Sequence, residues 1–196
     1  MLDLDFEKAE VDDVVLVFEG YASVFNVLDR DYDIVAEGAF DSFLQDNKGM
    51  RLPMFYEHDR ESCIGFIKEV KQDKNGLYVM GYVDPSLSSV SKHAYDKIVR
   101  TGIGNLSIGY MVNRVHDVKN SSIVADASLI EVSLVSLGSN SLAKIDKYKI
   151  INLSDGDTID NVDFDVNERE DDLEMVCNFV HSISLKLKVF FDLYYA

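Results

Sequence analysis

The feature that most constrains the fold is a series of short β-type runs separated by turn-forming residues. Apolar, aromatic and β-branched side chains mark six such runs, at residues 14–25, 52–56, 63–70, 77–83, 106–115 and 123–137. The third and fourth runs are joined by residues 73–76, which end in Asn75-Gly76, and Asn-Gly is a strong hairpin signal. Strands at this spacing favour a single barrel or closed sheet over alternating βαβ units.

Two helices are expected among the strands. Residues 38–46 place Phe40, Phe43 and Leu44 at helical spacing. A second amphipathic pattern follows Pro85 and ends near Thr101-Gly102, where a glycine is typical of a helix C-terminus. The predicted fold class is therefore mainly β with peripheral helices.

The character of the chain changes after residue 150. Its 196 residues are enough for one domain with a short appendage. Acidic side chains crowd residues 154–174, where Arg169 is the one basic residue, and such self-repulsion favours a solvated linker. We therefore expect a domain over residues 1–150 and an acidic linker with a C-terminal tail over residues 151–196.

The overall charge and the cysteine content exclude several classes of partner and compartment. A formal net charge of −16 repels phosphate groups, so neither nucleic acid nor an anionic membrane is expected as a partner. The two cysteines, Cys63 and Cys177, do not form a disulfide framework, and the chain opens without a secretory signal. These features together predict a globular protein of a reducing cytoplasm.

His58 is the first candidate for chemistry near neutral pH, where histidine is the natural base. It lies between Glu57 and Asp59, where an apolar strand turns polar. Barrels and sheets often carry functional side chains at strand ends. A surface histidine between two acids is the simpler interpretation of this segment taken alone.

Ser107 is the candidate nucleophile. In a strand, it shares one face with Gly109, whereas Leu106, Ile108 and Tyr110 share the other. A glycine neighbour predicts open space above the serine, through which a substrate carbonyl could approach. A serine that simply packs remains the alternative. Asn105 occupies the position of the first glycine of a G-x-S-x-G elbow, which disfavours an α/β-hydrolase.

Glu131 interrupts residues 129–135, a run that otherwise resembles a strand buried on both faces. A buried carboxylate is unfavourable unless it is paired or hydrogen-bonded. A histidine is a suitable partner, because a carboxylate orients the imidazole and stabilises its charged form. A partly exposed acid on an edge strand is the alternative.

Two other chemistries are weighed. The His58-Asp59 and His116-Asp117 pairs raise the possibility of a metal phosphohydrolase, although both pairs lie among strand-forming residues. Cys63 with His58 would suggest a thiol protease, but Cys63 heads an apolar run and is more simply a small core residue. We therefore predict neither a metal nor another cofactor.

Four blocks in order resemble the prohead (capsid maturation) protease family of tailed phages, which is related to the herpesvirus assemblins. Together they span roughly residues 15–145. The blocks are residues 18–26 with 33–40, Tyr-Glu-His-Asp at 56–59 with Ile64-Gly65, Leu-Ser-Ile-Gly-Tyr at 106–110, and residues 129–135 with Asn140.

The resemblance implies a closed antiparallel β-barrel of the herpesvirus-protease type and a serine endopeptidase. It also implies Ser107 as nucleophile, His58 as general base and Glu131 as the orienting third residue. The sequence does not show which amides form the oxyanion hole, and loops rich in glycine or near Arg114 are the candidates. A catalytically inactive capsid assembly factor with the same barrel is the alternative function.

The expected partners follow from the same resemblance. The substrates would be the major capsid protein and the scaffold, cut in the host cytoplasm within the assembling prohead. Because related assemblins work as dimers, a homodimer is also expected.

Overall fold

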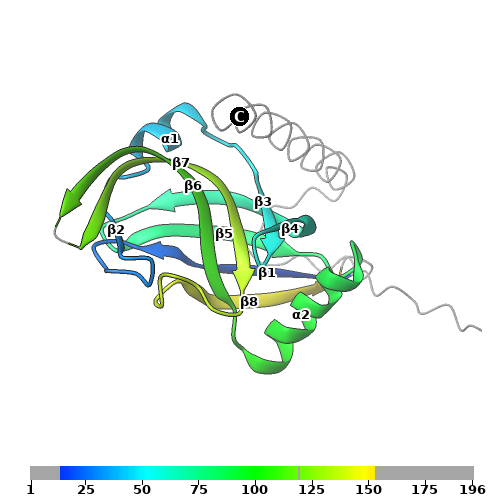
Figure 1. Cartoon of the computed structure of the whole chain (residues 1–196). Helices are drawn as coiled ribbons and strands as arrows, with labels where there is room; N and C mark the ends of the chain where they lie inside the picture. Colours follow the sequence, from blue (N-terminus) through cyan, green and yellow to red (C-terminus); the bar gives the residue numbers. More distant parts are fainter. Residues whose placement is uncertain (1–13, 119, 153–196) are drawn as a thin grey trace, which may run out of the picture.

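The computed structural model describes residues 14–118 and 120–152, and every structural statement below concerns this part of the chain. It contains one eight-stranded sheet and two helices (Figure 1). The elements are β1 (Val14–Val24), β2 (Asp33–Val35), α1 (Asp41–Asp46), β3 (Leu52–Tyr56), β4 (Asp59–Gln72), β5 (Gly76–Val83), α2 (Ser89–Thr101), β6 (Asn105–Val118), β7 (Ser121–Val135) and β8 (Lys144–Asn152).

The strands are ordered β2-β7-β3-β4-β5-β1-β8-β6, and β6 pairs in addition with β7. The predicted class, mainly β with peripheral helices, is confirmed. The expectation of a wholly antiparallel sheet is wrong, because β7 pairs in parallel with both β2 and β3. Between β3 and β7 the chain reverses direction an even number of times, through β4, β5, α2 and β6, so β7 runs the same way as β3. Parallel neighbours require long connections of this kind.

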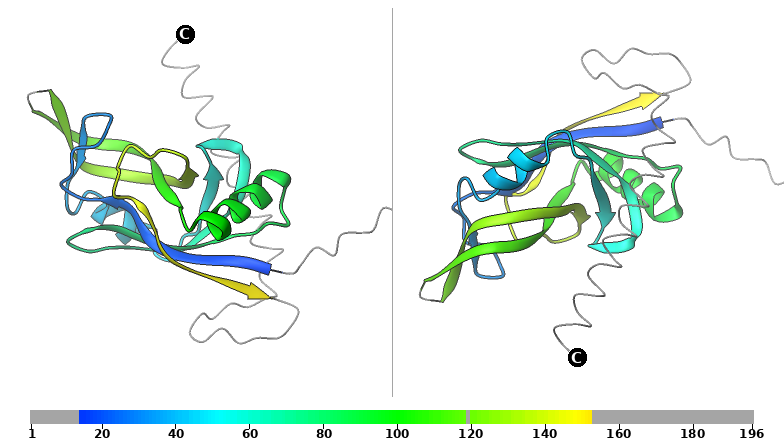
Figure 2. Two further views of the ribbon diagram at one scale, coloured as in Figure 1. Left: turned by 90° about the horizontal axis from the view of Figure 1, so that it is seen from below. Right: turned by 90° about the horizontal axis from the view of Figure 1, so that it is seen from above.

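The strand pairings form a circuit that is weakest between β8 and β6. That contact consists of one register pair, Asn105 with Lys144. Two backbone bonds flank it, from Ile145 N to Gly104 O at 2.7 Å and from Leu106 N to Ala143 O at 3.1 Å. The views in Figure 2 show β6 and β7 extending together away from the other strands. The fully closed barrel therefore stays a prediction.

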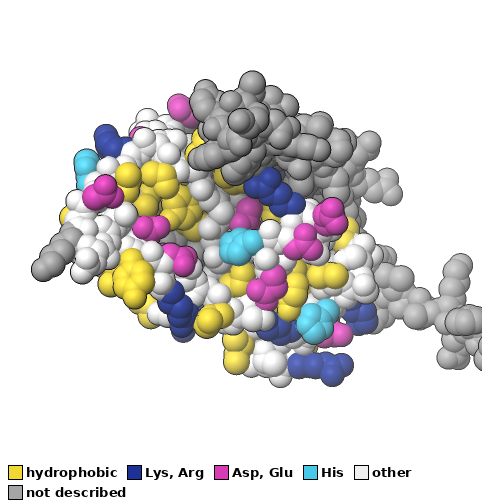
Figure 3. All heavy atoms as spheres, in the orientation of Figure 1, with side chains coloured by type: hydrophobic (Ala, Val, Ile, Leu, Met, Phe, Trp, Pro, Cys, Tyr) yellow, Lys and Arg dark blue, Asp and Glu magenta, His cyan; other side chains and the backbone are white. Residues whose placement is uncertain are grey.

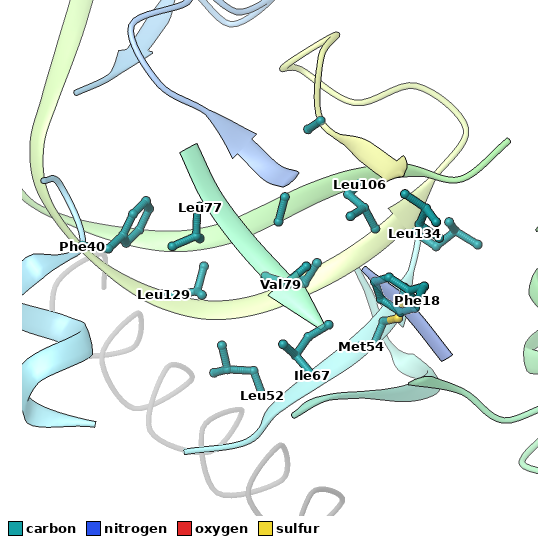
Figure 4. Packing of buried hydrophobic residues seen from close by; sticks show 14 of the residues in the cluster. Phe18, Phe40, Leu52, Met54, Ile67, Leu77, Val79, Leu106, Leu129 and Leu134 are labelled. Atoms are coloured by element: carbon teal, nitrogen blue, oxygen red, sulfur yellow. The ribbon is translucent and has the colours of Figure 1, made fainter. Parts of the chain in front are cut away.

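The core lies between the curved strands (Figure 4). Leu16, Phe18, Leu106 and Leu134 are among the side chains with no exposed surface in the main cluster. The run in β1 is apolar on both faces because Val15 and Val17 belong to a second cluster with Tyr82 and Ile151. Burial of these side chains is the main driving force for closing the sheet on itself.

The helices form close to where they were predicted. In α2, the side chain of Ser88 accepts a hydrogen bond from Ser91 N at 3.0 Å, and Gly102 ends the helix in the left-handed conformation at φ 65°. An N-cap serine and a left-handed glycine are standard helix boundaries. Helix α2 packs against β4, and α1 packs against β7. Neither described helix has the length and hydropathy needed to cross a membrane.

Several strand boundaries differ from the prediction. Strand β4 begins at Asp59 instead of residue 63, and β2 forms at residues where no strand was predicted. Strand β8 has no counterpart in the prediction because most of its side chains are exposed and four of its nine residues are charged, so its sequence lacks a continuous apolar run. The expected domain boundary at residue 150 falls inside β8. The predicted acidic linker and tail lie outside the described residues, apart from the end of β8.

Candidate active site

The three residues singled out from the sequence lie together at one end of the β6–β7 pair. The distance from Ser107 Oγ to His58 Nε2 is 2.9 Å. On the other side of the imidazole, His58 Nδ1 lies 2.7 Å from Glu131 Oε1. Ser107 belongs to β6, Glu131 to β7, and His58 to the turn between β3 and β4. Their catalytic roles stay predictions, but their side chains form one continuous hydrogen-bonded line.

The β6–β7 ladder places Ser107 and Glu131 on the same face. Ser107 lies opposite Ser133, and Gly109 lies opposite Glu131. Directly opposed residues in a ladder share a face, as do residues two apart along one strand. The ladder shifts register after the Gly109–Glu131 pair, so that Tyr110 is opposite Leu129. This irregularity lets Leu129 enter the core while Glu131 faces the site.

The space over Gly109, beside Ser107, is filled. The Glu131 side chain lies over this glycine so closely that a Cβ atom added there would be 2.4 Å from Oε1 and 2.9 Å from Cγ. Gly109 therefore does not supply the open space predicted above Ser107, although Ser107 itself borders a pocket. The glycine makes room for the carboxylate that contacts His58.

His58 lies in a two-residue hairpin turn, not at the end of a strand. Glu57 and His58 both have left-handed backbone conformations, with φ of 53° and 59°, between the paired residues Tyr56 and Asp59. Two-residue turns of this hand favour Asn-Gly, because side chains with a Cβ are strained there by about 1–2 kcal/mol each. The absence of that dipeptide explains why the sequence did not predict a turn.

The Glu57–His58 turn is anchored to the end of β7. The backbone N–H of Glu57 donates to Leu134 O at 2.9 Å. The Glu57 carboxylate accepts from Ser136 N–H at 2.7 Å. Strained backbone persists where the surroundings hold it in place. These two bonds fix the turn relative to the strand that carries Glu131.

The surroundings of His58 favour its charged form. The hydrogen bond to Glu131 is the largest cause that raises the pKa of His58, partial burial opposes it, and the charges of Glu131 and Glu57 raise it further. The His58 side chain is 44% exposed, whereas that of Glu131 is 7% exposed. Because a carboxylate only accepts hydrogen bonds, Nδ1 carries the single proton of the neutral imidazole, and Nε2 is then left to accept from Ser107.

The pocket beside the Ser107–His58 pair has an acidic wall. Asp29 and Asp31, from the loop before β2, line it together with Ser139 and Asn140. Burial raises the pKa of Tyr110, which also lines the pocket, to about 12, and the charges of Asp33, Asp29 and Asp31 contribute. Carboxylates on this wall therefore act on Tyr110 through their charge.

Arg114 does not reach the candidate site. It lies on β6 seven residues beyond Ser107, a distance of about 23 Å at about 3.3 Å per residue. Its Nη2 donates to Ala125 O at 3.4 Å on the neighbouring strand. The suggestion that residues near Arg114 supply oxyanion donors is therefore wrong. The other suggestion, a glycine-rich loop, stays a prediction, and the loop that contains Gly138 borders the pocket through Ser139 and Asn140.

The two other histidines in the described part of the chain, His93 and His116, and also Cys63 lie in other surroundings. His93, on α2, packs edge-on against Tyr56 with ring centroids 5.8 Å apart. His116 is exposed on β6, and among the described residues no group of three His, Cys, Asp or Glu side chains could hold a metal ion. Cys63 Sγ is directed at Gly65 O at 3.5 Å. Both ring nitrogens of His58 are instead taken by Ser107 and Glu131.

Comparison with known sequences places the chain in a class of viral peptidases. The sequence pattern of the caudovirus prohead serine proteases matches residues 3–156. The chain therefore belongs to the caudovirus prohead serine protease family. This confirms the family resemblance found in the four sequence blocks.

The prohead protease of Enterobacteria phage HK97 is 38% identical to the chain over 93 residues, which cover 45% of this chain and 41% of that protein. The chain thus matches less than half the length of this relative. Among solved structures, the capsid assembly protease of bacteriophage T4 aligns with a TM-score of 0.51 at 15% identity, over 61% of this chain and 80% of that one. This likeness concerns the fold. The protease of Kaposi's sarcoma-associated herpesvirus aligns with a TM-score of 0.48 at 17% identity, over 69% and 65% of the two chains.

Proposed function

We propose that the protein is a serine endopeptidase that processes capsid and scaffold proteins during phage prohead maturation. Ser107 is the nucleophile, His58 the general base and Glu131 the residue that orients His58. The observation that carries the proposal is the unbroken line from Ser107 Oγ through both ring nitrogens of His58 to Glu131 Oε1, with contacts of 2.9 and 2.7 Å. A serine, a base and an orienting acid at hydrogen-bond distance are the recognised arrangement for acyl transfer.

The first half of the reaction uses the proton on Ser107. His58 Nε2 takes this proton as Oγ attacks the carbonyl carbon of the scissile peptide bond. The imidazolium that results is stabilised by the Glu131 carboxylate on Nδ1. His58 then donates the proton to the nitrogen of the leaving amine, the C–N bond breaks, and an acyl-enzyme on Ser107 remains.

The second half repeats the same steps with water. His58 takes a proton from a water molecule, which attacks the ester carbonyl of the acyl-enzyme. The C–O bond to Ser107 breaks, and His58 returns the proton to Oγ. The new carboxyl terminus of the substrate is released, and no external reductant, oxidant or metal takes part in any step.

The proposed substrates are the major capsid protein and the scaffold, and the proposed location is the assembling prohead in the host cell. The names of the relatives support this, since one is a prohead protease of HK97 and another is a capsid assembly protease of T4. A homodimer is part of the proposal and is checked by sedimentation of the purified protein.

The proposal also includes the organisation of the chain. The protease domain comprises about residues 1–150, followed by an acidic linker and tail over residues 151–196. The circuit of strand pairings works as a closed barrel, supported by the bonds that join Gly104 and Leu106 to the segment leading into β8. Hydrogen exchange of Leu106 and Ile145 amides measures this closure, because paired amides in a closed sheet exchange slowly.

The experiment is co-expression with the major capsid protein and scaffold of the same phage, followed by intact mass spectrometry of both substrates. Wild type is compared with Ser107→Ala and with Ser128→Ala, which removes a hydroxyl from β7 away from the site. We expect a defined truncation with wild type and Ser128→Ala. Ser107→Ala should lose on the order of 10⁶-fold in kcat, which leaves the substrates intact.

Each other outcome has a definite meaning. Uncut substrates with folded wild-type protein would overturn the peptidase and favour an inactive assembly factor. Equal cutting by wild type and Ser107→Ala would overturn Ser107 as the nucleophile. Cutting abolished by Ser107→Ala but retained by both His58→Gln and Glu131→Gln would overturn the roles of these two residues.

A further inference from the structure

The second oxygen of the Glu131 carboxylate has its own partner. While Oε1 contacts His58, Oε2 accepts a hydrogen bond from Ser133 Oγ at 2.6 Å. Ser133 has no exposed surface, and it lies opposite Ser107 in the β6–β7 ladder. The sequence analysis gave Ser133 no role, because a serine in an apolar strand has many structural explanations.

We propose that Ser133 is a positioning residue that holds the Glu131 carboxylate against His58, and that Gly109 provides the space in which this carboxylate lies. The inference rests on the proposed function of Ser107, His58 and Glu131. It adds two residues that do not touch the reacting atoms and act only through Glu131.

The geometry restricts the carboxylate from three directions. The Ser133 hydroxyl must donate, because a carboxylate has no hydrogen to give. His58 Nδ1–H donates to the other oxygen. The third side is closed by the backbone of Gly109, and a Cβ atom on any larger residue at this position would lie 2.4 Å from Oε1. With both oxygens bound and one side against the backbone, the terminal torsion of Glu131 is fixed, although such torsions are otherwise broad.

Loss of the Ser133 hydroxyl should leave a buried charged oxygen without its donor. An unsatisfied buried acceptor is strongly unfavourable, and hydrogen bonds to charged groups are the stronger ones. The carboxylate would then turn to find another donor, and its contact with Nδ1 would lengthen. His58 would be less well oriented toward Ser107, so the chemical step would slow while substrate binding stayed the same.

The kinetic test compares Ser133→Ala with wild type on the capsid protein substrate. We expect kcat to fall between about tenfold and a hundredfold with KM nearly unchanged, which is the range for losing a hydrogen bond to a charged group. Ser133→Thr keeps the hydroxyl and should recover part of kcat. Wild-type kcat in Ser133→Ala would overturn the proposal.

The matched control is Ser91→Ala. Ser91 is also a serine without exposed surface, and its hydroxyl donates to Ile64 O at 3.1 Å, away from the candidate site. This variant should lower the melting temperature and keep the wild-type kcat. An equal fall in kcat in both variants would overturn the proposal, since it would point to a general loss of packing.

A second measurement does not depend on peptide cleavage. The pKa of His58 is measured by NMR titration in the Ser107→Ala background, with and without Ser133→Ala. The charged groups that act on His58 are Glu131 and Glu57. Because the bond to Glu131 is the main cause of the raised pKa, we expect that pKa to fall toward its ordinary value in Ser133→Ala and to stay raised in Ser91→Ala.

The two measurements separate failure of this inference from failure of the proposed function. A wild type that cuts no substrate, combined with a lowered His58 pKa in Ser133→Ala, would refute the peptidase and support the positioning by Ser133. A wild type that cuts, combined with an unchanged His58 pKa in Ser133→Ala, would refute the positioning and leave the peptidase standing.

Discussion

The two ends of the β6–β7 pair differ sharply although the same two strands form both. We define the ribbon base as residues 105–110 with 129–135 and the ribbon arm as residues 111–118 with 121–128. None of residues 105–110 is exposed, whereas every residue from 111 to 118 is. Hydrophobic side chains are visible on the surface over this pair of strands in Figure 3.

The difference shows how surroundings decide what a strand can carry. In the base, neighbouring strands bury residues 131–135, so that Glu131 is buried and held by specific partners. In the arm, Met111, Val112, Val115 and Val118 are exposed despite their apolar side chains. A polar group in the base therefore has few alternatives to its observed partners, while one in the arm can exchange its partner for water.

The largest expected difference in kcat is between variants of two acidic residues on β7, Glu131 in the ribbon base and Asp126 in the ribbon arm. Glu131→Gln should lower kcat about 10⁴-fold, because an amide holds the imidazole in the wrong tautomer. Asp126→Asn should leave kcat within about twofold of wild type. Among the hydrogen bonds described, the Asp126 carboxylate accepts only one, from Asn113 at 3.3 Å. Steady-state kinetics on a capsid-derived peptide measures both. Similar losses would show that position on the ribbon does not matter.

The next largest effect concerns stability. Leu106→Ala in the base should lower the free energy of unfolding by about 2–5 kcal/mol, because it leaves a cavity in a packed core. Val112→Ala in the arm should change it by less than about 0.5 kcal/mol, since the side chain is already 46% exposed. Urea denaturation of the two variants gives the comparison. Equal losses would mean that the arm is covered in solution, for instance by a second copy of the chain.

A smaller and more specific effect is expected at Gly109. Gly109→Ala should lower kcat by about tenfold or more, because the new Cβ displaces the end of the Glu131 side chain. Unfolding stability should also fall, by about 1–3 kcal/mol, because the displaced carboxylate is buried and loses hydrogen-bond partners. Met111→Ala, two residues along in the arm, is the control. Unchanged kcat in Gly109→Ala would contradict the placement of Glu131.

The smallest expected effect is on the pH dependence of activity and stability. It depends on the contact between His58 and Glu131 of the ribbon base. Because Glu131 raises the pKa of His58, the acid limb of the kcat/KM profile should lie above pH 6.5, where an unperturbed histidine titrates. The same raised pKa stabilises the fold below the unfolded value, and this stability is lost as the pH rises through the folded pKa. His58→Gln should remove that part of the pH dependence of unfolding. An acid limb at or below pH 6.5 would contradict the claim that Glu131 raises the pKa of His58.

The sequence alone predicted much of the fold and all three members of the candidate site. The β runs, the hairpin at Asn75-Gly76 and helix α2 could be predicted because periodicity and turn chemistry are local properties. Strand β8 could not, since an exposed, charged strand gains its structure from its neighbour β1. The turn at Glu57-His58 could not either, because its bonds to Leu134 and Ser136 come from a distant strand.

The sequence by itself determined which residues are available for chemistry: a serine beside a glycine, a histidine between two acids, and an isolated carboxylate in an apolar run. Only the tertiary structure decided that the space over Gly109 belongs to Glu131 and that Ser133 binds its second oxygen. The physical reason is that strand register and the shift after Gly109 depend on pairing between distant segments. A shift of one residue would exchange the faces of the strand, and no local pattern specifies it.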